Sequence, residues 1–267
     1  MKPDNKNSGL SVTIIALNEE HGIKDCLDGV QWADEVLVSD SGSIDKTVEI
    51  CRLTGALVFS DKWLGFGAQK NLVASRAQGQ WILNVDADER VSPELRDEIL
   101  KAISSGAASG YYVPRKNHFA GRWIRHCGWY PDYNLRLYRK DAGAFSERAV
   151  HEAVSVNGAV GYLKNPLIHY TYEDVSDYLD RMQRYSTLSA EQMKKDGRSA
   201  TVFDLLLRPC ATFLKMFVLK RGFLDGSVGL TLSMLYAAYT LAKYAKLREM
   251  LKDRDASSVN RRKDSTP

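Results

Sequence analysis

Two aspartates, Asp86 and Asp88, follow the apolar run at residues 81–85 with a single alanine between them. Successive side chains of a strand alternate between its faces, so both carboxylates point the same way if this stretch is extended. Mg²⁺ and Mn²⁺ prefer oxygen ligands, and Mg²⁺ is often held by one or two carboxylates together with substrate phosphates. The pair therefore indicates a site for Mg²⁺ or Mn²⁺ that also binds the diphosphate of a nucleotide donor. The alternative is an acidic turn exposed to solvent.

The elements around this pair have the pattern of βαβ units. We expect strands at residues 11–17, 35–39, 56–59 and 81–85, and helices at 46–53, 67–76 and from Pro93. Asp45 is the expected N-cap of the helix at 46–53, and Ser92 followed by Pro93 marks the start of the last helix. This alternation predicts an α/β fold with a parallel sheet and helices on both of its faces.

Polar clusters follow three of these expected strands. Asn18 and Glu19 come after the first strand, residues 40–45 after the second, and Asp86 and Asp88 after the fourth. Ligands of open α/β sheets bind beyond the carboxyl ends of the strands, so we expect the three clusters to form one site. Any one of them could instead be ordinary turn sequence. The chain has neither a G-x-G-x-x-G nor a P-loop motif, which disfavours a dinucleotide-binding domain and a P-loop ATPase.

The composition is that of an ordinary globular protein. The 267 residues are 44% hydrophobic and 26% charged, which is enough for one large domain or a domain with an appendage. A net charge of +4 is too small to argue for nucleic acid, and we expect none as a partner. The four cysteines form no C-x-x-C pair, which favours a reducing compartment over a zinc site or a disulfide framework. Residues 1–8 contain no apolar segment of a signal peptide.

Four stretches resemble a known family. SVTIIALNEE, VLVSDSGSIDKTVEI, GFGAQKNLVASRAQGQWILNVDADE and GWYPDYNLRLYRKDAGAF are similar to segments of the inverting family-2 glycosyltransferases, and the match covers residues 10–170. The whole chain is similar to bacterial β-1,4-glucosyltransferases that act on the inner-core heptose of lipopolysaccharide. The resemblance implies a GT-A fold, with a Rossmann-like, mostly parallel sheet, flanking helices and a C-terminal helical region. It also implies inverting transfer of glucose from UDP-glucose to a lipopolysaccharide core oligosaccharide.

The resemblance assigns the nucleotide-sugar donor to the first half of the chain. Asn18 and Glu19 match the pair that lines the nucleotide pocket of the family. Asp40 matches the aspartate that reads the uracil edge, and Ser41 stands where the family has a second acid. Lys70 matches a basic residue that could approach the diphosphate; the alternative is an exposed helix lysine.

The resemblance also implies a bound metal at the D-x-D motif. Asp88 would bridge Mg²⁺ or Mn²⁺ to the donor phosphates, with Asp86 near the ribose and the metal. His169 lies in the run LIHYTY at residues 167–172. It could be a third metal ligand, as a late histidine is in many GT-A enzymes, or a structural histidine.

The second half of the chain would bind the acceptor. Asp132 keeps the carboxylate of the family's E-D-x-D-L-x-x-R segment, whereas Pro131 and Asn134 replace two other acids. In inverting enzymes this aspartate is the general base, which takes a proton from the attacking hydroxyl. Glu152 is the alternative base, and His151 with Glu152 could instead contact the acceptor. Arg136 is one of several basic residues that could bind a phosphorylated or carboxylated core oligosaccharide.

The C-terminal region has the pattern of amphipathic helices. Residues 176–195 carry apolar side chains at helical spacing, and residues 203–219 are apolar with interspersed Arg208 and Lys215. The uncharged run at 226–242 is too short to span a bilayer. A basic, apolar helix pair fits the surface of a membrane, and a helical cap on the core or a dimer face fits equally well.

The resulting layout has four parts. We expect a flexible N-terminus at residues 1–9, a GT-A domain at 10–172, a helical region at 173–252 and a flexible tail at 253–267. Within the GT-A domain, residues 10–105 would bind the donor and 106–172 the acceptor. We expect a cytoplasmic enzyme, peripheral on the inner membrane, with a lipid-linked oligosaccharide acceptor. The alternatives are the same fold acting on a polyprenyl phosphate or a capsule or exopolysaccharide precursor, and a non-catalytic nucleotide-sugar-binding scaffold.

Overall fold

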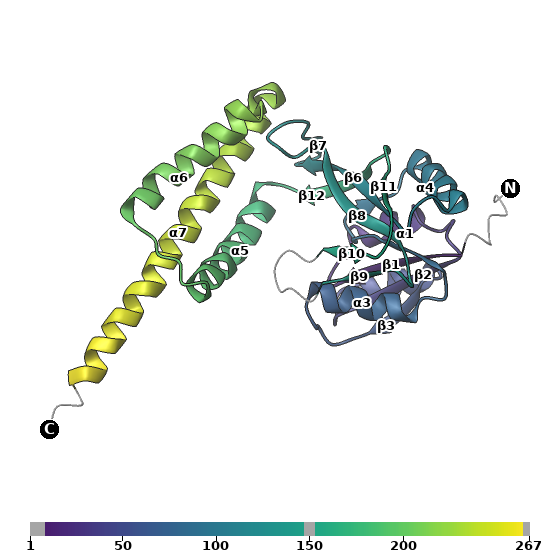
Figure 1. Ribbon diagram of the computed structural model, residues 1–267, viewed down its shortest axis with the longest axis horizontal. Coiled ribbons are helices and arrows are strands. Elements are labelled where there is room, and N and C mark those ends of the chain that lie inside the picture. The colour runs from purple at the N-terminus through teal and green to yellow at the C-terminus, as the bar shows by residue number, and fades with distance from the viewer. Residues whose placement is uncertain (1–8, 147–152, 264–267) are drawn as a thin grey trace. The chain divides into compact units, whose positions relative to one another are not determined.

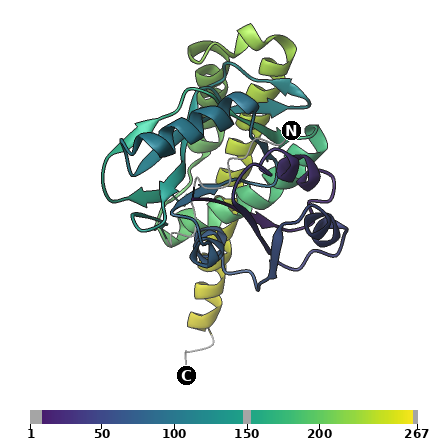
Figure 2. The same ribbon diagram turned by 90° about the vertical axis from the view of Figure 1, so that its right-hand side faces the viewer.

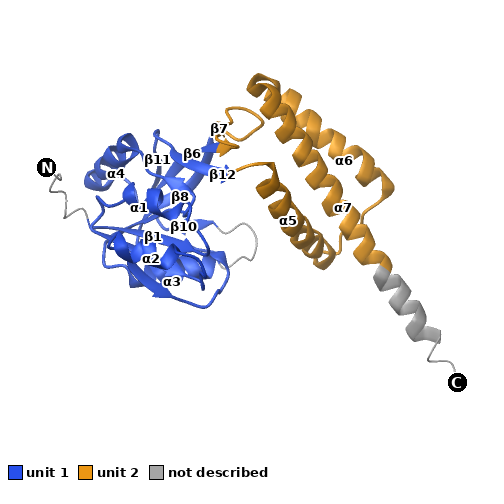
Figure 3. Cartoon of the chain, turned by 180° about the vertical axis from the view of Figure 1, so that it is seen from behind, with its two compact units in different colours: residues 1–117, 131–171 blue, residues 118–130, 172–267 orange. Residues whose placement is uncertain are grey.

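A computed structural model describes residues 9–146 and 153–263, with side chains through residue 252. The chain forms two compact units, which Figure 3 shows in different colours. Unit 1 comprises residues 1–117 and 131–171, and unit 2 comprises residues 118–130 and 172–267. Residues 118–130, which the sequence assigned to the acceptor half, therefore belong with the C-terminal helices.

The first part of unit 1 alternates strands and helices, as the sequence predicts (Figure 1). Its strands lie in the order β3-β2-β1-β4, and all three pairings are parallel. The elements are β1 (Leu10–Ala16), α1 (Ile23–Asp28), β2 (Glu35–Asp40), α2 (Thr47–Leu53), β3 (Leu57–Ser60), α3 (Phe66–Arg76) and β4 (Trp81–Asn84).

The same sheet continues through β4-β8-β6-β12-β5. β8 pairs antiparallel with both β4 and β6, and β12 pairs antiparallel with β5. The further elements are β5 (Glu89–Arg90), α4 (Pro93–Ser105), β6 (Gly110–Phe119), β7 (Arg122–Trp123), β8 (Asp132–Arg139), β9 (Gly143–Phe145), β10 (Val154–Val156), β11 (Val160–Tyr162) and β12 (Leu167–Tyr172). This mixed α/β sheet with flanking helices confirms the predicted fold class.

The sheet of unit 1 has a hydrophobic core on each face. Alternation along β4 sends Leu83 to one core and Ile82 to the other. The first core includes residues of α1, α2 and α4, and the second includes residues of α3, β9 and β10. Figure 2 shows these helices, coloured purple to blue, around the strands. Two buried faces explain why the central strands read as continuous apolar runs.

Of the two N-caps predicted from the sequence, Ser92 is confirmed and Asp45 is wrong. Ser92 caps α4, because its Oγ accepts a hydrogen bond from the backbone N–H of Leu95 at 3.2 Å, and Pro93 occupies the first turn. The prediction of Asp45 as the N-cap of α2 is wrong, because the N-cap is Lys46. Asp45 instead accepts hydrogen bonds from the backbone N–H groups of Thr47 at 3.0 Å and Glu20 at 3.1 Å. Its carboxylate thereby ties the loop after β1 to the loop after β2.

Unit 2 is built from helices around the segment 118–130. Its elements are α5 (Val175–Lys195), α6 (Val202–Leu214), the π-helical turn η1 (Lys215–Leu219), the 3₁₀ turn η2 (Gly222–Asp225) and α7 (Gly226–Lys263). Buried Phe119, Ile124 and Trp129 pack in one cluster with Tyr178 of α5 and Leu232 of α7. None of the described helices is long and apolar enough to cross a membrane.

Candidate active site

The loops after β1 and β2 meet at the carboxyl edge of the sheet, where the sequence places the nucleotide pocket. The side-chain Oδ1 of Asn18 accepts a hydrogen bond from the backbone N–H of Ile44 at 2.9 Å. The backbone N–H of Glu19 donates to Thr47 Oγ1 at 2.7 Å. Asn18 has φ of 57°, a left-handed conformation that asparagine tolerates better than most residues. Asn18, Glu19 and the 40–45 loop therefore lie together at one edge.

Asp40 shapes its own loop. Its side chain is buried, and its Oδ2 accepts hydrogen bonds from the backbone N–H groups of Gly42 and Ser43, both at 3.0 Å. Gly42 has φ of 102°, which favours glycine at this position. The carboxylate thus fixes the turn that the sequence assigns to the uracil ring.

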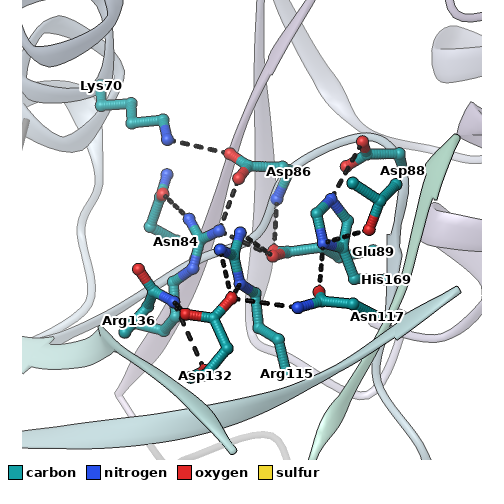
Figure 4. A network of polar contacts seen from close by, with 12 residues as sticks. Lys70, Asn84, Asp86, Asp88, Glu89, Arg115, Asn117, Asp132, Arg136 and His169 are labelled. Carbon is teal, nitrogen blue, oxygen red and sulfur yellow. Dashed lines mark hydrogen bonds and ion pairs between the residues drawn. The ribbon is translucent and has the colours of Figure 1, made fainter. Parts of the chain in front are cut away.

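Asp86 lies between two buried cations (Figure 4). Lys70 Nζ lies 2.9 Å from its Oδ1, and Arg136 Nη2 lies 2.5 Å from its Oδ2. Burial opposes ionisation of Asp86, but Arg136 and Lys70 outweigh it and hold the pKa of this carboxyl well below its usual range. Lys70 is only 5% exposed, so the alternative of an exposed helix lysine is wrong.

The pairing of β4 with β8 places Arg136 in the site. Leu83 pairs with Leu137 in antiparallel register, which puts Arg136 opposite Asn84, and Arg136 Nη1 donates to Asn84 Oδ1 at 2.9 Å. Arg136 Nη2 also lies 2.6 Å from Glu89 Oε1. Burial opposes the charge on Arg136, but Asp86 and Glu89 outweigh it and raise the pKa of the guanidinium further.

Glu89 is a site residue that the sequence reasoning missed. It is fully buried, and its Oε2 accepts a hydrogen bond from the backbone N–H of Asp86 at 2.9 Å. Because its other oxygen binds Arg136, Glu89 fixes both the backbone at the start of the D-x-D loop and the guanidinium that faces it. Its position directly after Asp88 was the only signal in the sequence.

The β12–β5 pairing brings His169 to Asp88. His169 pairs with Glu89 in the ladder, and its Nε2 lies 3.2 Å from Asp88 Oδ2. Its Nδ1 lies 2.7 Å from Asn117 Oδ1, and Asn117 Nδ2 donates to Asp132 at 3.2 Å. Thr171 Oγ1 lies 3.1 Å from the same Nδ1, so Asn117 and Thr171 hold one side of the ring and Nε2 faces the carboxylate of Asp88. An imidazole nitrogen beside a carboxylate oxygen is a pair that could share a bound cation.

Asp132 is held by three side chains. Arg115 pairs with it directly in the β6–β8 ladder and donates to its Oδ2 from Nε at 2.9 Å and from Nη2 at 2.6 Å. Asn117 also donates to Oδ2, and Asn134 donates to Oδ1 at 3.1 Å. Burial acts to raise the pKa of Asp132, but Arg115, Asn117 and Asn134 together lower it below its usual value. The carboxylate is therefore ionised at neutral pH.

The charges of the site suit a divalent cation and a diphosphate. Four carboxylates face three cationic side chains, and the group is formed by Asp86, Asp88, Glu89, Asp132, Lys70, Arg115 and Arg136. A divalent ion would turn the single excess negative charge into a positive one. Among residues whose placement is described, no three His, Cys, Asp or Glu side chains converge as in a complete protein-only metal site. Two protein ligands completed by phosphate oxygens fit this arrangement.

Two predicted site residues, His151 and Glu152, lie outside the described residues. The other sequence-predicted residues gather at the carboxyl edge of the parallel strands and in the antiparallel strands beside them. Arg136, predicted to bind the acceptor, turns its guanidinium toward Asn84, Asp86 and Glu89 instead of an open surface.

Comparisons with known proteins place this geometry in a family. The sequence model of Glycosyl transferase family 2 matches residues 11–159. An uncharacterized glycosyltransferase of Rickettsia typhi is 32% identical over 92% of this chain and 89% of its own length. The lipopolysaccharide core biosynthesis glycosyltransferase LpsC of Rhizobium meliloti is 30% identical over 88% of this chain and 91% of its own.

Among solved structures, S. aureus TarS in complex with UDP-GlcNAc is 16% identical, with a TM-score of 0.48 over 91% of each chain. The match to the family over more than half of the chain, together with full-length relatives at 30% identity or more, settles the class of the protein. The chain belongs to glycosyltransferase family 2 and is a glycosyltransferase with the GT-A fold.

Proposed function

We propose that this glycosyltransferase is a metal-dependent, inverting enzyme that transfers glucose from UDP-glucose to the core oligosaccharide of lipopolysaccharide. The observation that carries the proposal is the Asp88–His169 pair, at 3.2 Å, where Asp88 belongs to a group of seven charged side chains with one excess negative charge. The name of LpsC, lipopolysaccharide core biosynthesis glycosyltransferase, supports the choice of acceptor. UDP-glucose is proposed from the resemblance of the motifs.

The donor would bind at the carboxyl edge of the parallel strands. Asn18 and Glu19 would line the nucleotide, and the loop that Asp40 fixes would face the uracil ring. Lys70 is 5% exposed and already charge-paired with Asp86, so it would approach the diphosphate only as part of that pair. Both oxygens of Asp86 are already engaged by cations, so we assign Asp86 to the ribose side of the site and not to the metal.

Asp88 and His169 would hold Mg²⁺ or Mn²⁺ together with the donor phosphates. The bound ion would stabilise the negative charge that develops on the leaving diphosphate. The hydrogen bond from His169 Nδ1 to Asn117 supports this role, because it orients the ring with Nε2 toward Asp88. Arg136 would be a positioning residue that holds Asp86 and Glu89 rather than an acceptor ligand.

Asp132 would act as the general base. In an inverting reaction the acceptor hydroxyl attacks the anomeric carbon from the face opposite the leaving UDP, and it must lose its proton as the new bond forms. Arg115 and Asn117 keep the carboxylate ionised and oriented, at the cost of some basicity. Glu152 stays the alternative base.

The acceptor would be a lipid-linked oligosaccharide on the cytoplasmic face of the inner membrane. The test uses purified protein, UDP-glucose and core oligosaccharide from a strain that lacks this protein, with Mn²⁺, with Mg²⁺ or with EDTA. We expect UDP release, and the added mass of one hexose on the acceptor, with at least one cation and not with EDTA. UDP-galactose and UDP-GlcNAc serve as competing donors.

The test variant is Asp88→Asn, which should abolish turnover. The matched control is Asp97→Asn, which changes an exposed aspartate of α4 and should leave turnover unchanged. Transfer to a polyprenyl phosphate but not to the core oligosaccharide would refute the proposed acceptor. Full activity in EDTA would refute the role of the metal.

A further inference from the structure

The outer face of α6 and the turns after it is apolar and exposed. Phe203, Leu207 and Leu214 are 72%, 63% and 53% exposed, and Leu219 of η1 is 75% exposed. On α6 these side chains follow the spacing of one helical face, and none of the residues of α6 is buried. Phe223 and Leu224 of η2 are also apolar and exposed, at 50% and 56%. We call residues 203–224 the α6–η2 segment.

The opposite face of α6 is the one that packs in unit 2. Leu205 lies against the buried cluster that contains Tyr244 and Leu247 of α7. Thr212 Oγ1 lies 3.2 Å from Thr240 Oγ1, also on α7. The helix thus already buries one apolar face in unit 2, and the exposed face is a second one. Packing within the unit therefore does not account for the outer apolar residues.

The segment has a net positive charge, because its four cations outnumber its one acid, Asp204. Residues 205–224 contain no aspartate or glutamate and four cations, namely Arg208, Lys215, Lys220 and Arg221. The only acid of α6 is Asp204, which is engaged by Arg208 at 2.5 Å and by the capping box with Thr201. Apolar side chains flanked by cations are complementary to a surface that is apolar inside and anionic outside. A protein partner would not require that combination.

We propose that the outer face of the α6–η2 segment lies in the headgroup region of an anionic lipid bilayer. None of the described helices can cross a membrane, so the segment would lie parallel to the surface, with its apolar side chains buried and its cations at the phosphates. The inference deepens the proposed function and rests on it for its purpose, because a lipid-linked acceptor is held at such a surface.

The test is cosedimentation of the full chain with vesicles of phosphatidylethanolamine containing roughly a quarter phosphatidylglycerol, in parallel with phosphatidylcholine vesicles. We expect binding to the anionic vesicles that is at least about tenfold stronger. Leu207→Glu with Leu214→Glu should weaken that binding about a hundredfold, because it removes two buried apolar side chains and adds two anions. Lys215→Gln with Lys220→Gln should weaken it about tenfold or more, and high salt should do the same.

Leu53→Glu is the matched control, because Leu53 of α2 is 79% exposed and lies outside the segment. It should bind vesicles as the unaltered protein does, and circular dichroism should show that every variant is folded. Unchanged binding of the Leu207/Leu214 variant overturns the proposal. The proposal is also overturned if sedimentation velocity shows that the unaltered protein is a dimer and that the Leu207/Leu214 variant is a monomer. The vesicles carry neither donor nor acceptor, so vesicle binding is measured independently of turnover. Absence of turnover with every acceptor would refute the proposed function without changing the result of the vesicle-binding experiment.

Discussion

Asp86, Asp88 and Asp132 occupy three different surroundings within one network. Asp86 is enclosed by Lys70 and Arg136, whereas Asp88 faces the ring of His169 at 3.2 Å. Asp132 accepts hydrogen bonds from Arg115 and two amides and is half-buried. Three carboxylates of one type can therefore serve three purposes, because the partners of each one differ.

At Asp88, the change to asparagine should remove the dependence of donor binding on the metal. A neutral amide is a poor ligand for Mn²⁺ compared with a carboxylate, so the affinity for UDP-glucose should fall at least about tenfold in Mn²⁺, which is about 1.4 kcal/mol. In EDTA the variant and the unaltered protein should bind alike. Isothermal titration calorimetry checks both conditions. A variant that still responds to Mn²⁺ would show that Asp88 is not the metal ligand.

At Asp132, the change to asparagine should separate binding from turnover. The amide keeps the shape but accepts no proton, so kcat should fall by roughly 10² to 10⁴ while the Kd for UDP-glucose stays unchanged. Asp141→Asn is the control, because this exposed carboxylate pairs with Arg139 and lies outside the network around Asp132. Steady-state kinetics and calorimetry give the two quantities. Near-normal kcat would transfer the role of base to Glu152.

Arg115 sets the pKa of Asp132, which predicts a change in the pH profile. In Arg115→Gln the opposing effect of burial is less compensated, so the pKa of Asp132 should rise. A base works only when deprotonated, and the acid limb of kcat/KM should therefore move to higher pH. Arg139→Gln, on the same strand as Asp132, should leave the profile in place. A lower rate with an unmoved acid limb would contradict this account.

The sequence predicted the carboxylates of the site better than their partners. Asp86 and Asp88 are recognisable because they follow an apolar run one residue apart, although β4 ends at Asn84 and Asp88 lies in a turn instead of on an extended strand. Glu89 and Arg136 were not assigned to the network, because a buried ion pair between residues 47 positions apart depends on how strands pair. Arg136 read as one of many surface arginines until the β4–β8 register placed it opposite Asn84.

At the scale of elements, the parallel half of the sheet could be predicted from the sequence, whereas the strand pairing of the antiparallel half could not. Apolar runs and helical patterns predicted β1, β2, β4 and α3 within one residue at each end. β8 and β12 carry the candidate residues Asp132 and His169, but which strands they join is a tertiary property. Asp45 was misplaced as a cap for a similar reason, since its carboxylate serves a neighbouring loop as well as its own helix.

Arg136 joins three elements, so its loss should destabilise unit 1. Arg136→Met leaves Glu89 and Asp86 without their shared cation, and breaking a buried ion pair in this way costs about 3–5 kcal/mol. The loss should shrink at lower pH, because Arg136 helps to hold the pKa of Asp86 down and this contribution disappears once Asp86 is protonated. Arg139→Met is the matched control, because Arg139 is on the same strand as Arg136 and its exposed pair with Asp141 should contribute little to stability. Urea denaturation at neutral and acidic pH provides the comparison; equal losses in the two variants would contradict it.

At the scale of the whole molecule, the residues proposed to bind the donor and the metal lie in unit 1, and the α6–η2 segment lies in unit 2. Each unit has hydrophobic clusters of its own. Binding of the nucleotide sugar and attachment to a surface can therefore be altered separately by substitutions in different units.

A substitution that creates a cavity in the core of unit 2 tests whether the two units are independent. Leu232 is fully buried in the cluster with Trp129 and Tyr178, so Leu232→Ala should cost about 2–5 kcal/mol of stability. The affinity for UDP-glucose below the unfolding temperature should not change. Leu230→Ala, half-exposed on the same helix, is the control and should unfold like the unaltered protein. Calorimetry of unfolding and of binding would decide, and a parallel loss of donor affinity would show that the units depend on each other.

The assignment of residues 118–130 to unit 2 has a practical consequence for anyone who shortens the gene. A fragment that stops at residue 171 looks like a clean catalytic domain in the sequence, yet it retains a loop whose packing partners have been removed. Phe119, Ile124 and Trp129 would then meet water instead of Tyr178 and Leu232. Such a fragment should aggregate on expression, and replacing the loop with a short Gly-Ser bridge should recover soluble protein.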